Sequence, residues 1–179
     1  MFGHDLTVGA SGYYSRQDWG FSRHEDAWAG SSEWIMPLGS RFELSGEFYR
    51  GRAIGGLGGG IGRSVLFSTT AADPRARYRA LNATGGWAQI KFRQSDKLEW
   101  NGAYGQDAVP GRIVRFYPFF QQTYVGASIT RNESALANFI YRPRSDLMLS
   151  LEYRRIRTFS VLTNYDHADQ INLSMGVLF

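Results

Sequence analysis

The chain has 179 residues, enough for a single domain with a sizeable core. Its mean hydropathy of −0.33 and the absence of a long apolar run exclude a transmembrane helix. The net charge of +4 comes from dispersed basic residues, which argues against a nucleic-acid-binding surface, and the lack of cysteine excludes disulfides and thiol chemistry. Aromatic residues make up 15% of the chain and glycine numbers 21, a composition that favours a β-barrel with aromatic girdles over an ordinary globule.

Apolar and polar side chains alternate in several segments of the first half of the chain, the pattern of β-strands with one apolar and one polar face. The strands predicted in this half span residues 5–14, 26–36, 41–49 and 88–93. The sequence Pro-Leu-Gly-Ser at 37–40 predicts a tight turn between the second and third of these strands. Residues 53–82 are predicted to form a long loop.

The second half of the chain continues the alternation, and its predicted strands span residues 98–104, 123–142, 147–154 and 169–179. Segment 123–142 has two interpretations, because residues 131–133 (Arg-Asn-Glu) could form a hairpin turn inside it. Apolar residues keep one parity from Val125 to Tyr141. This constant parity favours a single long strand and preserves an up-and-down order.

The last predicted strand places Ile171, Leu173, Met175 and Val177 on one face and ends on Phe179. Chain ends of soluble proteins are usually frayed and polar. This strand is therefore interpreted either as an edge strand of a soluble sandwich or as the closing strand of a membrane barrel.

Short and long connections alternate strictly along the chain. The short turns are expected at 37–40, 94–97 and 143–146, and the long loops around 17–25, 53–82, 108–120 and 160–167. Short turns on one side and long loops on the other are typical of outer-membrane barrels. The predicted fold class is all-β, an antiparallel up-and-down transmembrane β-barrel with about eight strands in this chain. Residues 1–179 would form a single barrel domain or a C-terminal barrel segment.

Charged residues are sorted by strand face. On the apolar faces charges are expected only at strand ends, at Arg50 and Arg155, as for a surface that meets lipid, where a charge near the midplane would cost about 2–4 kcal/mol. In a soluble sandwich the same faces would form the core, but the small glycines that they carry would leave holes in one. The opposite faces hold five acids and five bases, predicted to line a lumen: Glu33, Arg41, Glu43, Glu47, Lys91, Arg93, Glu99, Arg142, Glu152 and Arg154.

Two meanings remain open for this charged set. It could be a structural ion-pair network, or it could be the lining of a polar channel. Because eight closed strands have an interior that side chains fill, an isolated barrel of this size favours the network.

The Gly-rich stretch 55–62 matches neither a phosphate-binding loop nor a dinucleotide fingerprint. It is interpreted either as a flexible loop or as a segment folded into the lumen as a constriction. His4, His24 and His167 are too scattered for a metal site. We assign no catalytic residue, no metal and no cofactor, and we expect the protein not to be an enzyme.

Residues 138–147 read Asn-Phe-Ile-Tyr-Arg-Pro-Arg-Ser-Asp-Leu, residues 151–154 read Leu-Glu-Tyr-Arg, and the terminal strand follows. This arrangement resembles the last hairpin of porin-like outer-membrane β-barrels of Gram-negative bacteria. The resemblance implies location in the outer membrane, contact with its lipids, passive diffusion of small polar solutes without a cofactor, and often homotrimers. It also implies that the barrel assembly machinery reads the terminal strand, with Ile171, Leu173, Met175, Val177 and Phe179 as its signal.

Porins have more strands than the eight predicted here, and no export signal precedes the first strand. We therefore expect the C-terminal portion of a larger barrel. Two functions remain open: porin-like diffusion through a wider wall, or a closed eight-stranded barrel that binds a surface partner or is purely structural and transports nothing.

Overall fold

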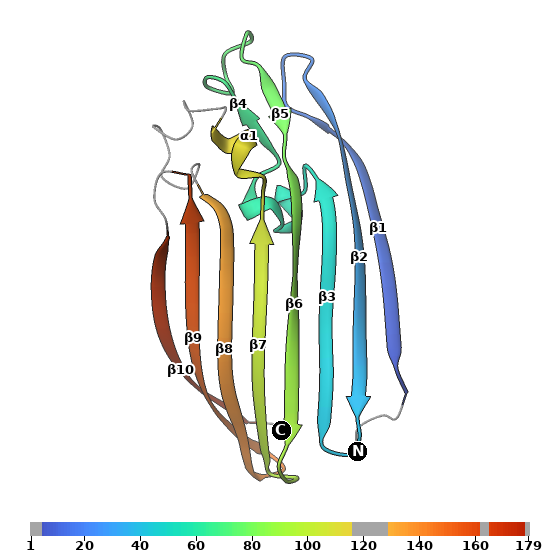
Figure 1. The fold of residues 1–179 in the computed structure, drawn as a ribbon, viewed down its shortest axis with the longest axis vertical. Helices are drawn as coiled ribbons and strands as arrows, with labels where there is room; N and C mark the ends of the chain where they lie inside the picture. Colours follow the sequence, from blue (N-terminus) through green and yellow to red (C-terminus); the bar gives the residue numbers. More distant parts are fainter. Residues whose placement is uncertain (1–4, 116–128, 162–164, 178–179) are drawn as a thin grey trace.

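Eight long strands form one antiparallel sheet in a computed structural model that describes residues 5–115, 129–161 and 165–177 (Figure 1). The strand order is β1-β2-β3-β6-β7-β8-β9-β10, so neighbours in the sheet are neighbours along the chain apart from an excursion between β3 and β6. These strands span Thr7–Asp18, His24–Leu38, Phe42–Arg52, Asn82–Arg93, Leu98–Ala108, Ile129–Arg144, Leu147–Ser160 and Asp166–Val177. The all-β antiparallel prediction is confirmed.

The sheet is curved and open. Within the described residues β1 pairs only with β2 and β10 only with β9, and these two edge strands lie on opposite sides of the sheet (Figure 1). The closed eight-stranded barrel is therefore wrong for this part of the chain. No second sheet of similar size covers either face of the sheet in the described residues.

The two ends of the sheet differ as predicted, but the long loop expected around 17–25 is only residues 19–23, because β1 extends to Asp18 and β2 begins at His24. Short turns join β2 to β3, β6 to β7 and β8 to β9 at one end, where β1 also begins and β10 ends (Figure 1). Two turn boundaries differ from the prediction: Pro37 and Leu38 belong to β2, and Pro143 and Arg144 belong to β8. Proline fits these places because they lie at strand ends, where the hydrogen-bonded ladder stops or, in β8, changes register.

Strand β8 shows whether the described part of segment 123–142 is one strand or a hairpin. It continues through residues 131–133 without a turn, and Asn132 is opposite Asp107 of β7 and Thr158 of β9. The single-strand interpretation is confirmed from Ile129 onward, and residues 123–128 lie outside the described ranges.

The predicted loop 53–82 is largely structured. It contains two 3₁₀ turns, η1 (Gly55–Leu57) and η2 (Gly60–Gly62), and a hairpin of β4 (Val65–Phe67) and β5 (Tyr78–Ala80), and β6 begins at Asn82 instead of residue 88. After β7 a short helix, α1, spans Gly111–Arg115. The helices in the described ranges are all too short to cross a membrane.

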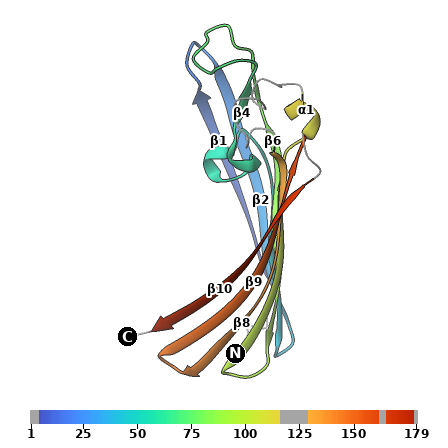
Figure 2. The ribbon, with the colours of Figure 1, turned by 90° about the vertical axis from the view of Figure 1, so that its left-hand side faces the viewer.

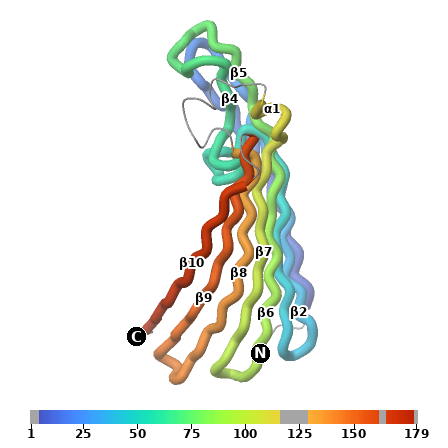
Figure 3. Tube along the Cα trace, turned by 60° about the vertical axis from the view of Figure 1, so that its left-hand side comes forward, coloured from blue at the N-terminus to red at the C-terminus, as the bar shows by residue number. Residues whose placement is uncertain are grey.

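The buried core lies at the long-loop end, where this excursion packs on the sheet (Figure 3). One cluster joins the excursion to β6, β7 and α1, and the other joins it to β2. Their buried members are Ile54, Leu66, Leu81, Ala83, Val109, Ile113 and Val114 in the first, and Ala27, Ala53, Val65, Phe67, Ala76 and Ala80 in the second. The rest of the sheet has no packed layer in the described residues, which leaves its apolar side chains exposed.

Gly46 of β3 accommodates a tryptophan ring on the apolar face. A Cβ at this position would overlap the Trp34 ring and lie 2.7 Å from the Trp87 carbonyl oxygen, whereas a Cβ at Gly30, on the same face of β2, would meet nothing within 4 Å. We expect Gly46→Ala to lower the free energy of unfolding by about 1–3 kcal/mol because the backbone carbonyl cannot move away cheaply. Urea unfolding in detergent micelles measures this, with Gly30→Ala as the control. Equal stability of the two variants would contradict the close approach of Trp34.

Candidate functional site

The polar face of the sheet carries a continuous row of polar residues. Six directly opposed residues, one from each of six neighbouring strands, make up this row: Glu43, Lys91, Asn101, Asn138, Glu152 and Asn172. Three of them belong to the predicted charged set. Within that set Glu33 is opposite Glu47, and Arg93 is opposite Glu99, while Arg41 lies in the turn before β3.

Ion pairs and hydrogen bonds connect this row across the strands. Lys91 Nζ lies 2.9 Å from Glu43 Oε1, and Asn101 donates to Asn138 Oδ1 at 2.9 Å. On β9 and β10, Arg154 and Asn172 both reach Glu152 Oε1 at 3.1 Å. These contacts support the interpretation of the charges as a paired network.

In this network the carboxylates lie deeper than their cationic partners. The Glu99 side chain is 10% exposed and that of its partner Arg142 is 40% exposed, across an N–O distance of 3.7 Å. Asn101 also donates to Glu99 at 3.1 Å. The buried carboxylate is therefore held by more than one donor, as a buried charge requires.

The Gly-rich stretch docks on this polar face at the long-loop end of the sheet, on its concave side (Figure 2). Asp107 of β7 accepts hydrogen bonds from the backbone N–H of Gly60 at 3.1 Å and of Ile61 at 2.6 Å. The Tyr49 hydroxyl donates to the same carboxylate at 2.5 Å. We call residues 54–64 the docked segment.

Tyr49 reaches Asp107 from β3 by crossing β6. Its ring passes over Gly85, where a Cβ would collide with the phenol ring. Gly85 thus opens the path between two strands that are not neighbours in the sheet. Residues 55–62 are thus held on the charged face by hydrogen bonds from Gly60 and Ile61, and their role as a constriction in a lumen stays a prediction.

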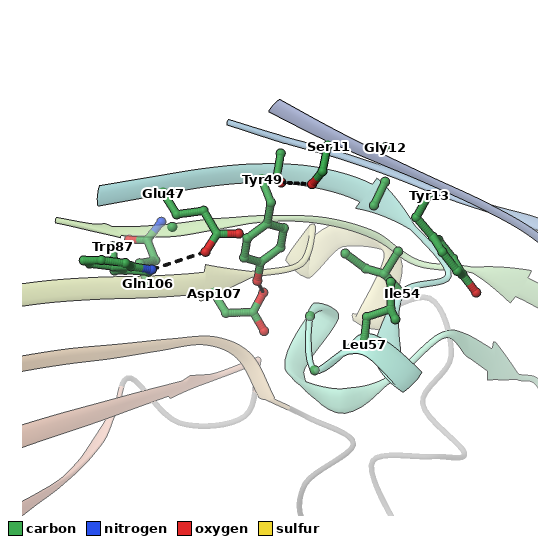
Figure 4. A pocket seen from close by; sticks show the side chains of 15 residues that line it. Ser11, Gly12, Tyr13, Glu47, Tyr49, Ile54, Leu57, Trp87, Gln106 and Asp107 are labelled. Carbon is green, nitrogen blue, oxygen red and sulfur yellow. Dashed lines mark hydrogen bonds between the residues drawn. The ribbon is translucent and has the colours of Figure 1, made fainter. Parts of the chain in front are cut away.

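A cavity of about 490 Å³ lies between the docked segment and the polar face of the sheet. Residues of β1, β2, β3, β6 and β7 form its sheet side (Figure 4). Its wall combines aromatic rings, two carboxylates, small residues and the apolar side chains of the docked segment. The lining residues that matter below are Tyr13, Glu47, Tyr49, Leu57, Trp87 and Asp107. The volume is in the range of sites that hold small organic molecules.

The opposite face of the sheet is apolar and exposed. On β10, Ile171 is 76% and Leu173 is 81% exposed, and Met175 and Val177 lie on the same side. These residues belong to the predicted assembly signal, whose last member, Phe179, lies outside the described residues. Exposed aromatic residues of this face are Tyr14, Trp28, Phe42, Phe48, Trp100, Tyr104, Tyr141 and Tyr153.

Charges also occur on this apolar face near the long-loop end. Tyr14 donates to Asp26 at 3.0 Å, and Tyr153 donates to Asp169 at 2.7 Å, with Arg155 Nε 3.6 Å from the same Asp169 oxygen. The expectation of charges only at Arg50 and Arg155 is therefore wrong. Asp26 and Asp169 are the first residues of the predicted strands 26–36 and 169–179, and both lie near the long-loop ends of β2 and β10.

Sequence reasoning missed three residues that shape this site: Tyr49, Trp87 and Asp107. Trp87 lies on the polar face, where the alternation of apolar and polar residues predicts a polar side chain. The Gly85-Gly86 pair beside it is the local signal of a close approach, because glycine inside a strand often marks one. Asp107 had no such signal, since its partners are 46 and 47 residues away along the chain.

A comparison with solved structures finds a similar fold in the outer membrane channel DcaP of Acinetobacter baumannii. The two share 14% sequence identity with a TM-score of 0.67, and the match covers 95% of this chain and 46% of the channel. The chain thus spans about half the length of that channel. No family model and no curated protein sequence matches the chain. The likeness concerns the fold: an antiparallel sheet of the kind found in an outer-membrane channel.

Proposed function

We propose that this chain forms part of the wall of an outer-membrane channel through which small polar solutes diffuse. The observation that carries the proposal is an open, curved sheet with an exposed apolar outer face and a charged inner face, on which the chain's own docked segment rests. The proposal assigns no catalytic step and no cofactor to the chain.

The outer face supports a lipid environment. Soluble proteins rarely leave a contiguous apolar surface of this extent uncovered, whereas a membrane barrel requires one. The tyrosines that donate to Asp26 and Asp169 combine a ring toward the apolar surface with a hydroxyl toward charged groups. That combination suits the boundary between hydrocarbon and headgroups.

The two sheet edges support a wall wider than eight strands. A barrel of eight strands has no room for an aqueous channel, so a channel requires that further strands pair with β1 and β10. The docked segment would then narrow the passage near the long-loop end. By analogy with outer-membrane barrels, the short turns would face the periplasm and the long loops the outside.

The partners follow from the same proposal. Membrane lipids would cover the outer face, and the barrel assembly machinery would recognise the last strand. A homotrimer is the oligomer that the resemblance to porins implies.

Electrical recording in planar lipid bilayers tests this proposal on the full-length polypeptide, folded in detergent. We expect stable, stepwise increases in conductance that scale with the concentration of a small electrolyte. Vesicle controls must first demonstrate that the protein inserts. If it inserts and the bilayer still shows no conductance, the transport assignment is overturned and a structural or surface-binding role is favoured.

A further inference from the structure

We propose that the cavity beneath the docked segment is a subsite for a small organic cation, such as a quaternary ammonium solute. This inference rests on the proposed channel function and adds to it a class of solute. It arises from three features of the cavity: exposed aromatic rings, carboxylates outside the ion-pair network, and a wall without basic residues (Figure 4).

The aromatic feature is Trp87 on the polar face. Its side chain is 43% exposed, although its neighbours on this face are polar, and its indole N–H donates to Glu47 Oε2 at 3.3 Å. Tyr13 of β1 is 37% exposed at the other end of the same cavity. Indole and phenol faces attract cations through the ring quadrupole, most strongly for tryptophan.

The charge feature is Glu47, which lines the cavity, together with its neighbour Glu33, which lies outside the lining. They are directly opposite each other on β2 and β3, an arrangement of like charges that destabilises a sheet. Neither forms an ion pair with a residue in the described ranges, in contrast to Glu43, Glu99 and Glu152. A bound cation would relieve this repulsion.

The wall of the cavity completes the argument. Its described lining contains Glu47 and Asp107 but no arginine, lysine or histidine. Asp107 is occupied by its three donors from Tyr49, Gly60 and Ile61. Glu47 therefore supplies the negative charge beside Trp87, and Leu57 and Ile54 give the apolar contact that an alkylated ammonium group needs.

Calorimetric titration of choline chloride into the full-length protein, folded in detergent, tests the subsite without requiring conductance. We expect saturable binding that weakens at least about tenfold in Glu47→Gln and in Trp87→Leu, and that Trp87→Phe largely restores. Trp100→Leu is the matched control, because Trp100 is 45% exposed on the opposite face, and Asp96→Asn controls for loss of an exposed charge.

Several outcomes would overturn the inference: no saturable choline binding by the folded wild-type protein, equal weakening in the controls, or binding of glucose or succinate at the same residues. Conductance measured on the same preparation separates the two proposals. If the protein conducts but does not bind choline, the channel proposal stands and the subsite proposal is wrong. If the protein shows no conductance but binds choline in a Trp87-dependent manner, the subsite proposal stands and the channel proposal is wrong.

Discussion

Asp107→Ala is expected to detach the docked segment from the polar face. The carboxylate accepts from two backbone N–H groups of η2 and from the Tyr49 hydroxyl, all within 3.1 Å. Hydrogen bonds to a charged group contribute about 1.5–3 kcal/mol each, and their sum is less than additive. A loss of about 3 kcal/mol would shift the docking equilibrium by roughly a hundredfold.

Limited proteolysis of the folded protein measures this release. Cleavage within residues 54–64 should become much faster in Asp107→Ala, and it should stay at the wild-type rate in Asp96→Ala, a control in the exposed turn between β6 and β7. If the chain forms a channel, the unit conductance should also rise, since the segment no longer narrows the passage. Wild-type cleavage and conductance in Asp107→Ala would mean that the apolar contacts of Ile54 suffice to hold the segment.

Arg23→Met is expected to detach the β4–β5 hairpin from the β1–β2 turn. The Arg23 guanidinium is buried, with the residue 5% exposed, and donates to carbonyl oxygens on both sides: Gly20 and Trp19 in the turn, and Ala71 and Asp73 in the hairpin connection. It also lies 4.9 Å from the centre of the Phe67 ring. Methionine keeps most of the volume but removes all of these guanidinium hydrogen bonds. Backbone N–H groups still donate to Gly20 O and Asp73 O, whereas the carbonyls of Trp19 and Ala71 lose the Arg23 donor, so that the local cost is about 2–4 kcal/mol.

Hydrogen exchange of the hairpin amides reports this change. The bonds from Ser68 N–H to Arg77 O and from Leu81 N–H to Ser64 O should open more often in Arg23→Met. Arg75→Met removes an exposed guanidinium from the same hairpin and should leave exchange unchanged. Protection factors equal to wild type in Arg23→Met would show that Val65 and Phe67 alone anchor the hairpin.

The strands and their faces could be predicted from local sequence because period-2 alternation is a local property. The polarity of residues 41–49, 98–104 and 147–154 dictated which side chains share a face, and register pairs such as Lys91 with Asn101 then follow from hairpin turns of a few residues. The same local information predicted the alternation of short and long connections and the single strand through residues 131–133.

The long connection between β3 and β6 could not be predicted in this way. Its shape depends on Asp107, Arg23 and Val114, which meet it only after the sheet has formed and whose spacing along the chain carries no periodic signal. The charges on the apolar face could not be predicted for a related reason: near the loops, Asp26 and Asp169 accept hydrogen bonds from the tyrosines Tyr14 and Tyr153.

Closure of the sheet was also decided at the tertiary level. Alternation specifies the two faces of each strand, but it does not determine the angle between successive strands. That angle determines whether eight strands close into a barrel or remain an open sheet. The amino-acid pattern thus determined an antiparallel sheet with an apolar and a charged face. The open edges, the docked segment and the cavity beneath it depend on contacts between distant residues, which only the folded arrangement brings within a few ångströms.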